Sequence, residues 1–245
     1  MKQKVDYGFD APKVIGSLFF FGLLAFACIP MIAMIESPYW FWPVFLYFLL
    51  AALALFMTGC WMLYGIRVAK PRLIRQQVEG LNLQGNEHIL DLGCGRGLFL
   101  IEAAKQLMTG KAVGIDLWQT KDQSGNSPKA AIRNGKIEGV EERIEVKTGD
   151  LRCLPFPDQS FDVALSSLAL HNIPDKLGRQ QALKEMLRVL KPGGNFTILD
   201  IYHSKEYTDF LVKQGDCIVK CSSPTYYYCP PITIINGIKA STNES

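Results

Sequence analysis

Two long uncharged apolar segments dominate the first 66 residues of the chain. Residues 14–35 and residues 39–66 contain no charged side chain, and each exceeds the roughly 20 residues that a helix needs to cross a bilayer core. A signal peptide has a shorter apolar region, and a single buried core helix would not account for two such segments in succession. The pattern therefore predicts an N-terminal tail and two transmembrane helices within residues 1–66, followed by an amphipathic linker over residues 67–84.

The distribution of lysine and arginine around these segments predicts their orientation. Basic side chains flank the pair on both sides, and the short connection between the two segments contains none. Cytoplasmic loops carry an excess of such residues, so both termini and everything after the second segment are expected in the cytoplasm. The flanking basic residues are Lys2, Lys4, Lys13, Arg67, Lys70, Arg72 and Arg75.

After residue 85 the pattern changes to short apolar runs that alternate with helical stretches. Such alternation predicts an α/β fold with a parallel sheet covered on both faces, and ligands bind at the carboxyl ends of its strands. Residues 85–240 are expected to form this domain, and residues 241–245 a disordered tail. The predicted strands are residues 88–92, 112–117, 144–147, 161–166 and 196–201, with two later extended runs at 217–228 and 231–239.

The first of these strands ends in an acid and runs into a glycine-spaced turn. The turn places Gly93, Gly95 and Gly97 in a G-x-G-x-G pattern after Asp91. It would bring backbone N–H groups and a helix N-terminus close to a ligand, with no side chain in between. The dinucleotide fingerprint is G-x-G-x-x-G, and position 98 is leucine, so the spacing argues against a nicotinamide-linked oxidoreductase.

This turn resembles the first motif of the class I S-adenosylmethionine (SAM)-dependent methyltransferases. The runs at residues 154–162 and 187–194 are also similar to this family, and the resemblance covers roughly residues 83–239. It implies a Rossmann-like sheet of seven strands with the last strand antiparallel, and SAM as the cofactor.

The resemblance also implies which residues bind SAM. The glycine turn would lie against the methionine and ribose parts, an acid after the second strand would accept bonds from the ribose hydroxyls, and an acid after the third strand would receive the adenine amino group. The segment after the fourth strand would lie beside the methyl group. The residues so implied are Asp91, Gly93, Cys94, Gly95, Gly97, Asp116, Leu117, Asp150, Leu151 and Ser166.

A catalytic base is harder to identify, because methyl transfer draws much of its rate from positioning. His171 is the best candidate for an acceptor that arrives protonated. The alternative is that His171 only orders its loop or packs against the cofactor. His203 is a weaker second candidate, and the tyrosines at 226–228 are either part of an acceptor pocket or core and edge residues of a strand.

Composition narrows the range of partners. The chain carries 26 Lys and Arg against 23 Asp and Glu, too balanced for a dedicated nucleic-acid surface. Seven cysteines occur without a C-x-x-C pair, so we expect free thiols in a cytoplasmic domain and no metal site. The oligomeric state stays open.

The sequence thus predicts a membrane-anchored methyltransferase that acts on a small, apolar or lipid-like acceptor. One alternative is a tethered protein or RNA methyltransferase, but residues 166–169 read Ser-Ser-Leu-Ala and lack the Asn-Pro-Pro-Tyr-like tetrad of many such enzymes. Another is a non-catalytic SAM-binding sensor, although no glycine or acid of the motifs is missing.

Overall fold

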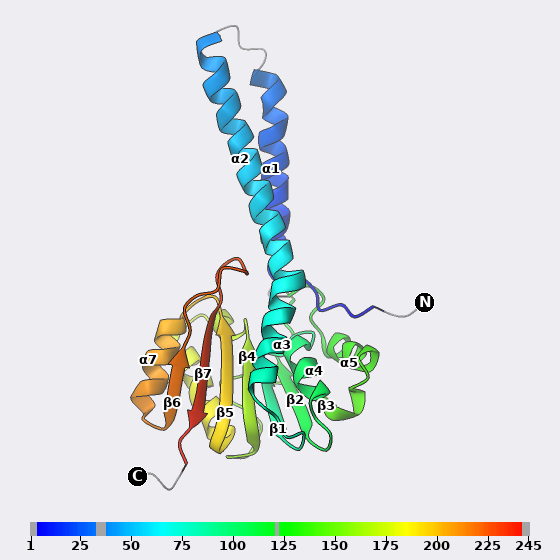
Figure 1. Cartoon of the computed structure of the whole chain (residues 1–245), viewed down its shortest axis with the longest axis vertical. Helices are drawn as coiled ribbons and strands as arrows, with labels where there is room; N and C mark the ends of the chain where they lie inside the picture. Colours follow the sequence, from blue (N-terminus) through cyan, green and yellow to red (C-terminus); the bar gives the residue numbers. More distant parts are fainter. Residues whose placement is uncertain (1–3, 33–37, 121–122, 242–245) are drawn as a thin grey trace.

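A helical hairpin rises from one end of an α/β domain in the computed structural model of the chain (Figure 1). The structure describes residues 4–32, 38–120 and 123–241. The end of the first predicted span, most of the connection to the second, and residues 242–245 of the predicted tail lie outside the described residues.

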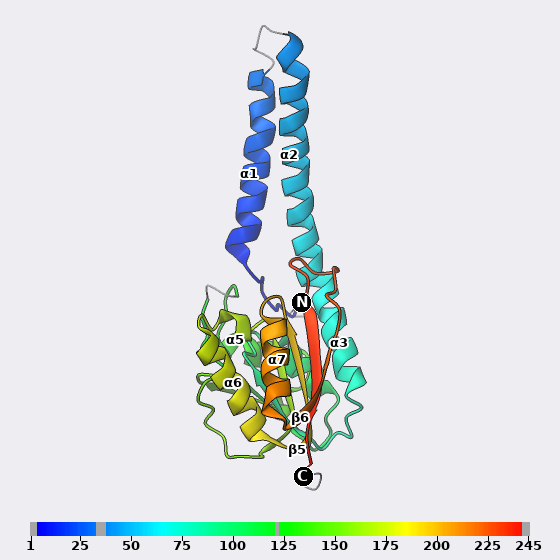
Figure 2. The same ribbon diagram turned by 90° about the vertical axis from the view of Figure 1, so that its left-hand side faces the viewer.

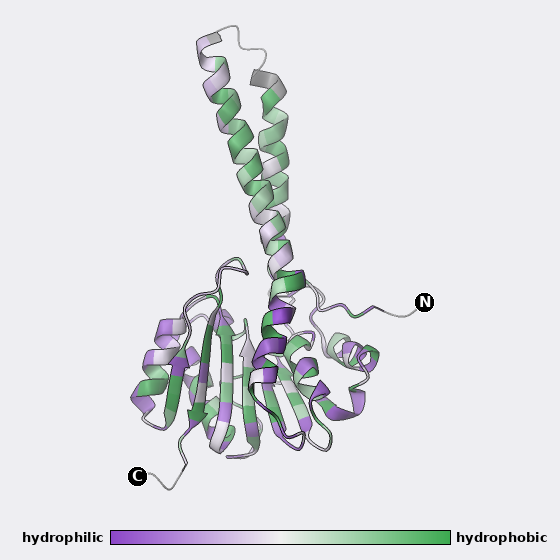
Figure 3. Ribbon diagram, viewed as in Figure 1, coloured by the Kyte–Doolittle hydropathy of each residue, from purple (hydrophilic) through white to green (hydrophobic). Residues whose placement is uncertain are grey.

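The hairpin consists of α1 (Pro12–Ile32) and α2 (Pro38–Tyr64). The helices pack edge to face through Phe19 and Phe56, whose ring centroids lie 5.0 Å apart. Both are long and apolar enough to cross a membrane by length and composition, and only 11% of the most apolar window of each is buried. A core helix of a soluble protein would be mostly buried. Figure 3 shows that hydrophobic residues predominate along the hairpin.

The predicted linker continues the second helix without a break. A π-helical turn, η1 (Gly65–Ala69), follows α2 directly, and the amphipathic helix α3 (Lys70–Gly80) follows η1. The backbone N–H of Lys70 donates to the Gly65 carbonyl, the wider hydrogen bond of a π turn. The amphipathic segment was predicted, but not its continuity with the apolar helix.

The sheet has the seven strands that the family resemblance implies, in the order β3-β2-β1-β4-β5-β7-β6. Strand β7 pairs antiparallel with both β5 and β6, whereas β1 to β5 are parallel to one another. The strands are β1 (His88–Leu92), β2 (Lys111–Asp116), β3 (Ile144–Thr148), β4 (Phe161–Ser167), β5 (Leu190–Asp200), β6 (Cys217–Cys221) and β7 (Thr233–Lys239).

Helices cover both faces of the sheet, and the central strands β1, β2 and β4 are accordingly buried on both sides. Side chains of α3 and α4 pack into one hydrophobic core, and those of α6 and α7 into the other. Figure 2 shows α6 and α7 on the face away from α3. The remaining elements are α4 (Leu98–Lys105), α5 (Pro128–Ile137), α6 (Lys176–Val189), α7 (Ser204–Gln214) and the 3-10 turns η2 (Glu141–Arg143) and η3 (Leu170–Asn172).

The carboxyl ends of the parallel strands lie at the end of the sheet from which the hairpin rises (Figure 1). The chain before α1 folds back onto this same end. Phe9 N donates to Ser124 Oγ (2.8 Å), and the Arg96 guanidinium forms an ion pair with Asp6 (2.8 Å). The N-terminal segment, residues 4–11, is therefore part of the α/β domain and not a free tail.

Candidate functional site

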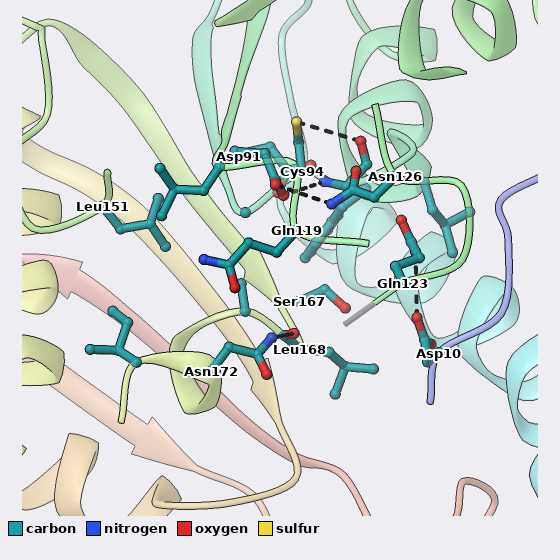
Figure 4. Close-up of a pocket in the computed structure, with 18 of the residues that line it drawn as sticks. Asp10, Asp91, Cys94, Gln119, Gln123, Asn126, Leu151, Ser167, Leu168 and Asn172 are labelled. Carbon is teal, nitrogen blue, oxygen red and sulfur yellow. Dashed lines mark hydrogen bonds between the residues drawn. The ribbon is translucent and has the colours of Figure 1, made fainter. Parts of the chain in front are cut away.

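One pocket opens among the carboxyl ends of β1, β2, β3 and β4 (Figure 4). It includes most of the residues that the sequence nominated for a cofactor: Asp91, Gly93, Cys94, Gly95, Asp116, Leu117, Asp150 and Leu151. Gly97, Ser166 and His171 are not among its lining residues.

The glycine turn after β1 is shaped by residues that need a left-handed backbone. Gly93 has φ +74°, and a Cβ on it would collide with the Cβ of Ala169 in the segment after β4. Gly97 has φ +86° and caps the N-terminus of α4. Glycine therefore allows the turn to lie close under the pocket and to start the helix immediately beneath it.

Asp91 links this turn to α4. Its carboxyl is buried, and Oδ2 accepts a hydrogen bond from the backbone N–H of Leu100 at 2.9 Å. Burial, with a smaller contribution from the nearby Asp116 carboxylate, raises the pKa of Asp91 to about 7. A titratable group at such a position responds strongly to a positively charged ligand.

Asp116 ties the glycine turn to the loop after β2. Its Oδ2 accepts from Gly95 N at 2.9 Å, and its Oδ1 accepts from Trp118 N at 2.5 Å and from Asn126 Nδ2 at 3.2 Å. The sequence nominated Asp116 but not Asn126, whose buried Oδ1 has no hydrogen-bond partner among the described residues. An unpaired buried oxygen that lines a pocket is suited to a ligand hydroxyl or amino group.

The third strand contributes Asp150 and Leu151. The Arg152 guanidinium donates to the Asp150 carboxylate at 2.6 and 3.0 Å and holds its pKa below the usual range. Leu151 and Leu117 present apolar surface from neighbouring strand ends. Together they provide an apolar wall with an ionised acceptor, which suits a flat heterocycle with an exocyclic amino group.

The pleat of β4 decides which serine reaches the pocket. Ser166 Oγ donates to the Leu92 carbonyl at 3.1 Å and is buried in the sheet. The next residue, Ser167, lines the pocket, and its Oγ has no partner among the described residues. Side chains alternate across a strand, so the structure places Ser167 where the sequence had nominated Ser166.

The sequence analysis also nominated Cys94, which lines the pocket, and His171, which lies beside it. Burial raises the pKa of the Cys94 thiol well above its usual value, so Cys94 lines the pocket as a small apolar group. His171 lies in η3 beside the pocket, where its Nδ1 contacts Asp200 Oδ1 at 2.5 Å and its backbone N–H donates to Asp200 Oδ2 at 3.1 Å. Asp200 could have been nominated from the sequence, since it ends β5 as Asp91 and Asp116 end or nearly end their strands.

Three further lining side chains, Asp10, Lys70 and Gln123, meet at the pocket from distant parts of the chain, and Tyr228 joins them from outside the lining. Lys70 Nζ donates to Asp10 Oδ2 at 2.8 Å, and the hydroxyl of Tyr228 donates to the same oxygen at 3.0 Å. Gln123 Nε2 donates to Asp10 Oδ1 at 3.4 Å. The sequence analysis counted Lys70 among the basic residues that flank the two apolar segments. It did not nominate Asp10 or Gln123 for the cofactor site.

The remaining candidates lie outside the pocket. His203 faces Glu206 at 3.8 Å with a largely exposed ring, and Tyr226 and Tyr227 are exposed on the loop between β6 and β7. All seven cysteines are free. Among the described residues no group of three or more His, Cys, Asp or Glu side chains is arranged to hold a metal ion.

Comparison with known proteins supports a single family. Residues 90–198 match the family described as "Methyltransferase domain" (Methyltransf_11). Demethylmenaquinone methyltransferase of Lactiplantibacillus plantarum is 34% identical over 129 residues, which cover 51% of this chain and 50% of that protein. Sterol 4-C-methyltransferase strm-1 of Caenorhabditis elegans is 33% identical over 129 residues, which cover 53% of this chain and 35% of that protein. The chain spans about half or less of the length of these relatives.

Solved structures show the same fold at low identity. A SAM-dependent methyltransferase from Aquifex aeolicus has a TM-score of 0.53 at 19% identity, covering 68% of this chain and 89% of its own. The [4+2]-cyclase SpnF has a TM-score of 0.58 at 19% identity, covering 70% and 82%. The fold alone thus leaves the reaction open, whereas the sequence relatives are methyltransferases.

The pocket has the chemistry that SAM requires. SAM has a sulfonium, an ammonium and two ribose hydroxyls, all of which carboxylates can bind, and an adenine ring that apolar side chains can cover. Carboxylates and apolar side chains both line this pocket. Residues 90–198 thus match a methyltransferase domain, the relatives of the chain are named as methyltransferases, and the chemistry of the pocket agrees with SAM as the cofactor.

Proposed function

We propose that this chain is a membrane-anchored enzyme that transfers a methyl group from SAM to a small apolar acceptor, with its catalytic domain on the cytoplasmic side. The acceptor would be resident in the membrane or concentrated at its surface. Basic residues on both outer flanks of the hairpin support this orientation.

The observation that carries the proposal is that the wall of the cofactor pocket belongs to the membrane helix. Lys70 and Ile74 line the pocket and lie on the helix that continues from α2. At 1.5 Å per residue they lie only about 6–12 Å beyond Ile66, the last residue of the apolar run. The polar head-group layer is roughly 5–8 Å thick on each side of the bilayer, so the pocket would open just beneath it.

The loop between β6 and β7 supports the same placement. It rises beside the base of α2 (Figure 1), and its Tyr228 packs against Gly65, where a Cβ would lie only 3.1 Å from the ring. Tyr226 and Tyr227 on this loop are 65% and 74% exposed. Tyrosine is enriched at membrane–water interfaces, where its apolar ring and polar hydroxyl are both accommodated.

The apolar part of the pocket supports an apolar acceptor. Ile74, Phe99, Leu168 and Ile173 line it together with the cofactor residues. The relatives named above are, by their names, methyltransferases of demethylmenaquinone and of a sterol carbon. We therefore place this chain's acceptor in the same chemical class of extended, water-insoluble molecules.

In the proposed reaction the protein mainly positions the reactants. SAM supplies a methyl group made electrophilic by its sulfonium. Asp116 would bind the ribose, Asp150 and Leu151 the adenine, and Asp91 the positive end of the cofactor. The apolar pocket would exclude water, so the acceptor meets the methyl group in line and without competing hydrolysis.

His171 would act as a base for an acceptor with an acidic proton. An ionised Asp200 can only accept a hydrogen bond, so the pair places the proton on Nδ1 and leaves Nε2 as a proton acceptor. Asp200 would hold this tautomer and stabilise the charged ring. For an acceptor without such a proton, the same pair would only order η3 beside the cofactor.

A labelling experiment tests the function directly. The purified full chain in mild detergent receives methyl-labelled SAM and a total membrane extract, and we expect label in the organic fraction. Gly93→Val is the matched inactive control, because its side chain would collide with Ala169. Label in protein or RNA would contradict the proposal in favour of a tethered modifying enzyme. SAM binding without transfer to any fraction would favour a sensor.

Replacement of Asp116 tests the cofactor assignment. Asp116→Ala removes a charged acceptor, and we expect SAM binding to weaken by about 1.5–3 kcal/mol, which is roughly ten- to 150-fold. Isothermal titration calorimetry measures the change. Asp209→Ala, which removes the same charge from the exposed side of α7, should leave the affinity unchanged. Equal affinity of Asp116→Ala and the wild type would exclude the assignment.

The raised pKa of Asp91 predicts a pH dependence. A carboxyl in the unfolded chain titrates near 4, and Asp91 titrates at about 7 in the fold. The contribution of Asp91 to the stability of the cofactor-free fold therefore decreases as pH rises from about 4 to about 7. Above about pH 7 this contribution does not change further. SAM has a net positive charge and should prefer the ionised form, so its affinity should rise about tenfold between pH 6 and pH 8.

The variant Asp91→Asn provides the control for this dependence. It keeps the shape of the side chain and cannot ionise, so calorimetry should give a weaker affinity that is nearly constant over the same pH range. A wild-type affinity that is already constant between pH 6 and pH 8 would refute the role of Asp91.

Variants of His171 separate base catalysis from positioning. If His171 removes a proton, His171→Ala should lower kcat by about a hundredfold or more. Asp200→Asn should displace the pH profile of kcat. Calorimetry measures the affinity of each variant for SAM and reports whether η3 is still ordered. Loss of a base alone should leave this affinity unchanged. A decrease of only a few fold would limit the pair to positioning.

A further inference from the structure

Lys70 is the only basic residue among the described residues that line the cofactor pocket. Four carboxylates line the same pocket: Asp10, Asp91, Asp116 and Asp150. SAM complements this excess of negative charge with its sulfonium and ammonium groups. Its methionyl part also ends in a carboxylate, which needs a positive partner in a site of this charge.

The environment of Lys70 leaves part of its ammonium group unused. The residue is only 7% exposed, and lysine is rarely so buried unless it is paired. Nζ has three donors, and among the described residues it has one hydrogen-bond acceptor, Asp10 Oδ2 at 2.8 Å. A buried ammonium that lines a pocket can satisfy a further donor with an oxygen of the ligand.

Lys70 and Asp10 lie at the end of the pocket where the methionyl part would lie. Figure 4 shows Leu151, the adenine side, and Asp10 on opposite sides of the pocket. Asp10 accepts a bond from Gln123, and Gln123 Oε1 in turn accepts from Arg96 N of the glycine turn at 2.9 Å. The side chain of Gln123 thus connects the Lys70–Asp10 pair to the glycine turn, which would lie against the methionine and ribose parts of SAM.

We propose that the ammonium of Lys70 binds the α-carboxylate of SAM, and that Asp10 holds Lys70 in position for it. The inference depends on the proposed function only in taking SAM as the ligand. Lys70 follows the second apolar helix and Asp10 precedes the first. The two ends of the hairpin therefore complete the cofactor site, and the hairpin is more than a tether.

The π turn explains how a residue of the membrane helix reaches the pocket. A π turn inserts one residue into the helix and so rotates everything after it by about 100° relative to an unbroken α-helix. The bond from Lys70 N to Gly65 O closes this turn. The turn thus sets which face of α3 carries Lys70 and Ile74 toward the pocket.

The test compares SAM, decarboxylated SAM and 5′-methylthioadenosine as ligands of the full chain in detergent, by calorimetry and without an acceptor. We expect Lys70→Met to weaken SAM binding at least tenfold, because a charged hydrogen bond is lost. The affinity for decarboxylated SAM should not fall. The ratio of the two dissociation constants would then change at least tenfold between the wild type and the variant.

Three controls keep the result interpretable. Binding of 5′-methylthioadenosine, which lacks the amino-acid end, should be unchanged and reports an intact adenosine site. Lys70→Arg retains the charge and should retain most of the discrimination. Arg72→Met removes a charge from an exposed position of the same helix and should change nothing. Lys70→Gln replaces Lys70→Met if the latter does not bind 5′-methylthioadenosine.

The proposal is overturned if the Lys70 variants weaken SAM and decarboxylated SAM by the same factor, or if neither affinity changes. A wild-type protein that binds SAM with this discrimination but transfers no methyl group would refute the proposed function and leave the role of Lys70 intact.

Discussion

The continuous helix from Pro38 to Gly80 is the constraint on which the arrangement of this protein depends. A continuous helix transmits position along its length, and here α2, the π turn and α3 join an apolar segment to one wall of the cofactor pocket. A flexible linker would leave the pocket at a variable distance from a membrane. The helix instead fixes the position of the pocket relative to the apolar hairpin.

The chain before the hairpin provides a second attachment between the hairpin and the α/β domain. Asp6 forms an ion pair with Arg96, and the backbone N–H of Phe9 donates a hydrogen bond to Ser124. Asp10 accepts hydrogen bonds from Lys70 and Tyr228. These partners come from the turn before α4, the loop after β2, the helix that continues from α2 and the loop after β6. Burying polar groups is favourable only when they are paired, so the hairpin and the domain are expected to move as one unit.

The strand ends supply the chemistry because all parallel strands end on the same edge of the sheet. Asp91, Asp116 and Asp200 end or nearly end β1, β2 and β5. Their carboxylates accept hydrogen bonds from backbone N–H groups of α4, the glycine turn and η3, in that order. The acids therefore have two roles. They order the segments around the pocket, and Asp91 and Asp116, which line it, place negative charge where we propose that the positively charged cofactor binds.

The sequence by itself determined the features that depend on local order along the chain. The hairpin follows from two uncharged runs, the sheet from alternating apolar segments, and the glycine turn from the spacing of Gly93, Gly95 and Gly97, since each is set by neighbouring residues. Only the tertiary structure decided which side chains reach the pocket. The pleat of β4 directs Ser167 and not Ser166 into it, and the fold brings Asp200 to His171. The π turn and the returning N-terminal segment bring Lys70 and Asp10 together although 60 positions separate them. Such contacts depend on register, helical phase and long-range packing, which no local pattern specifies.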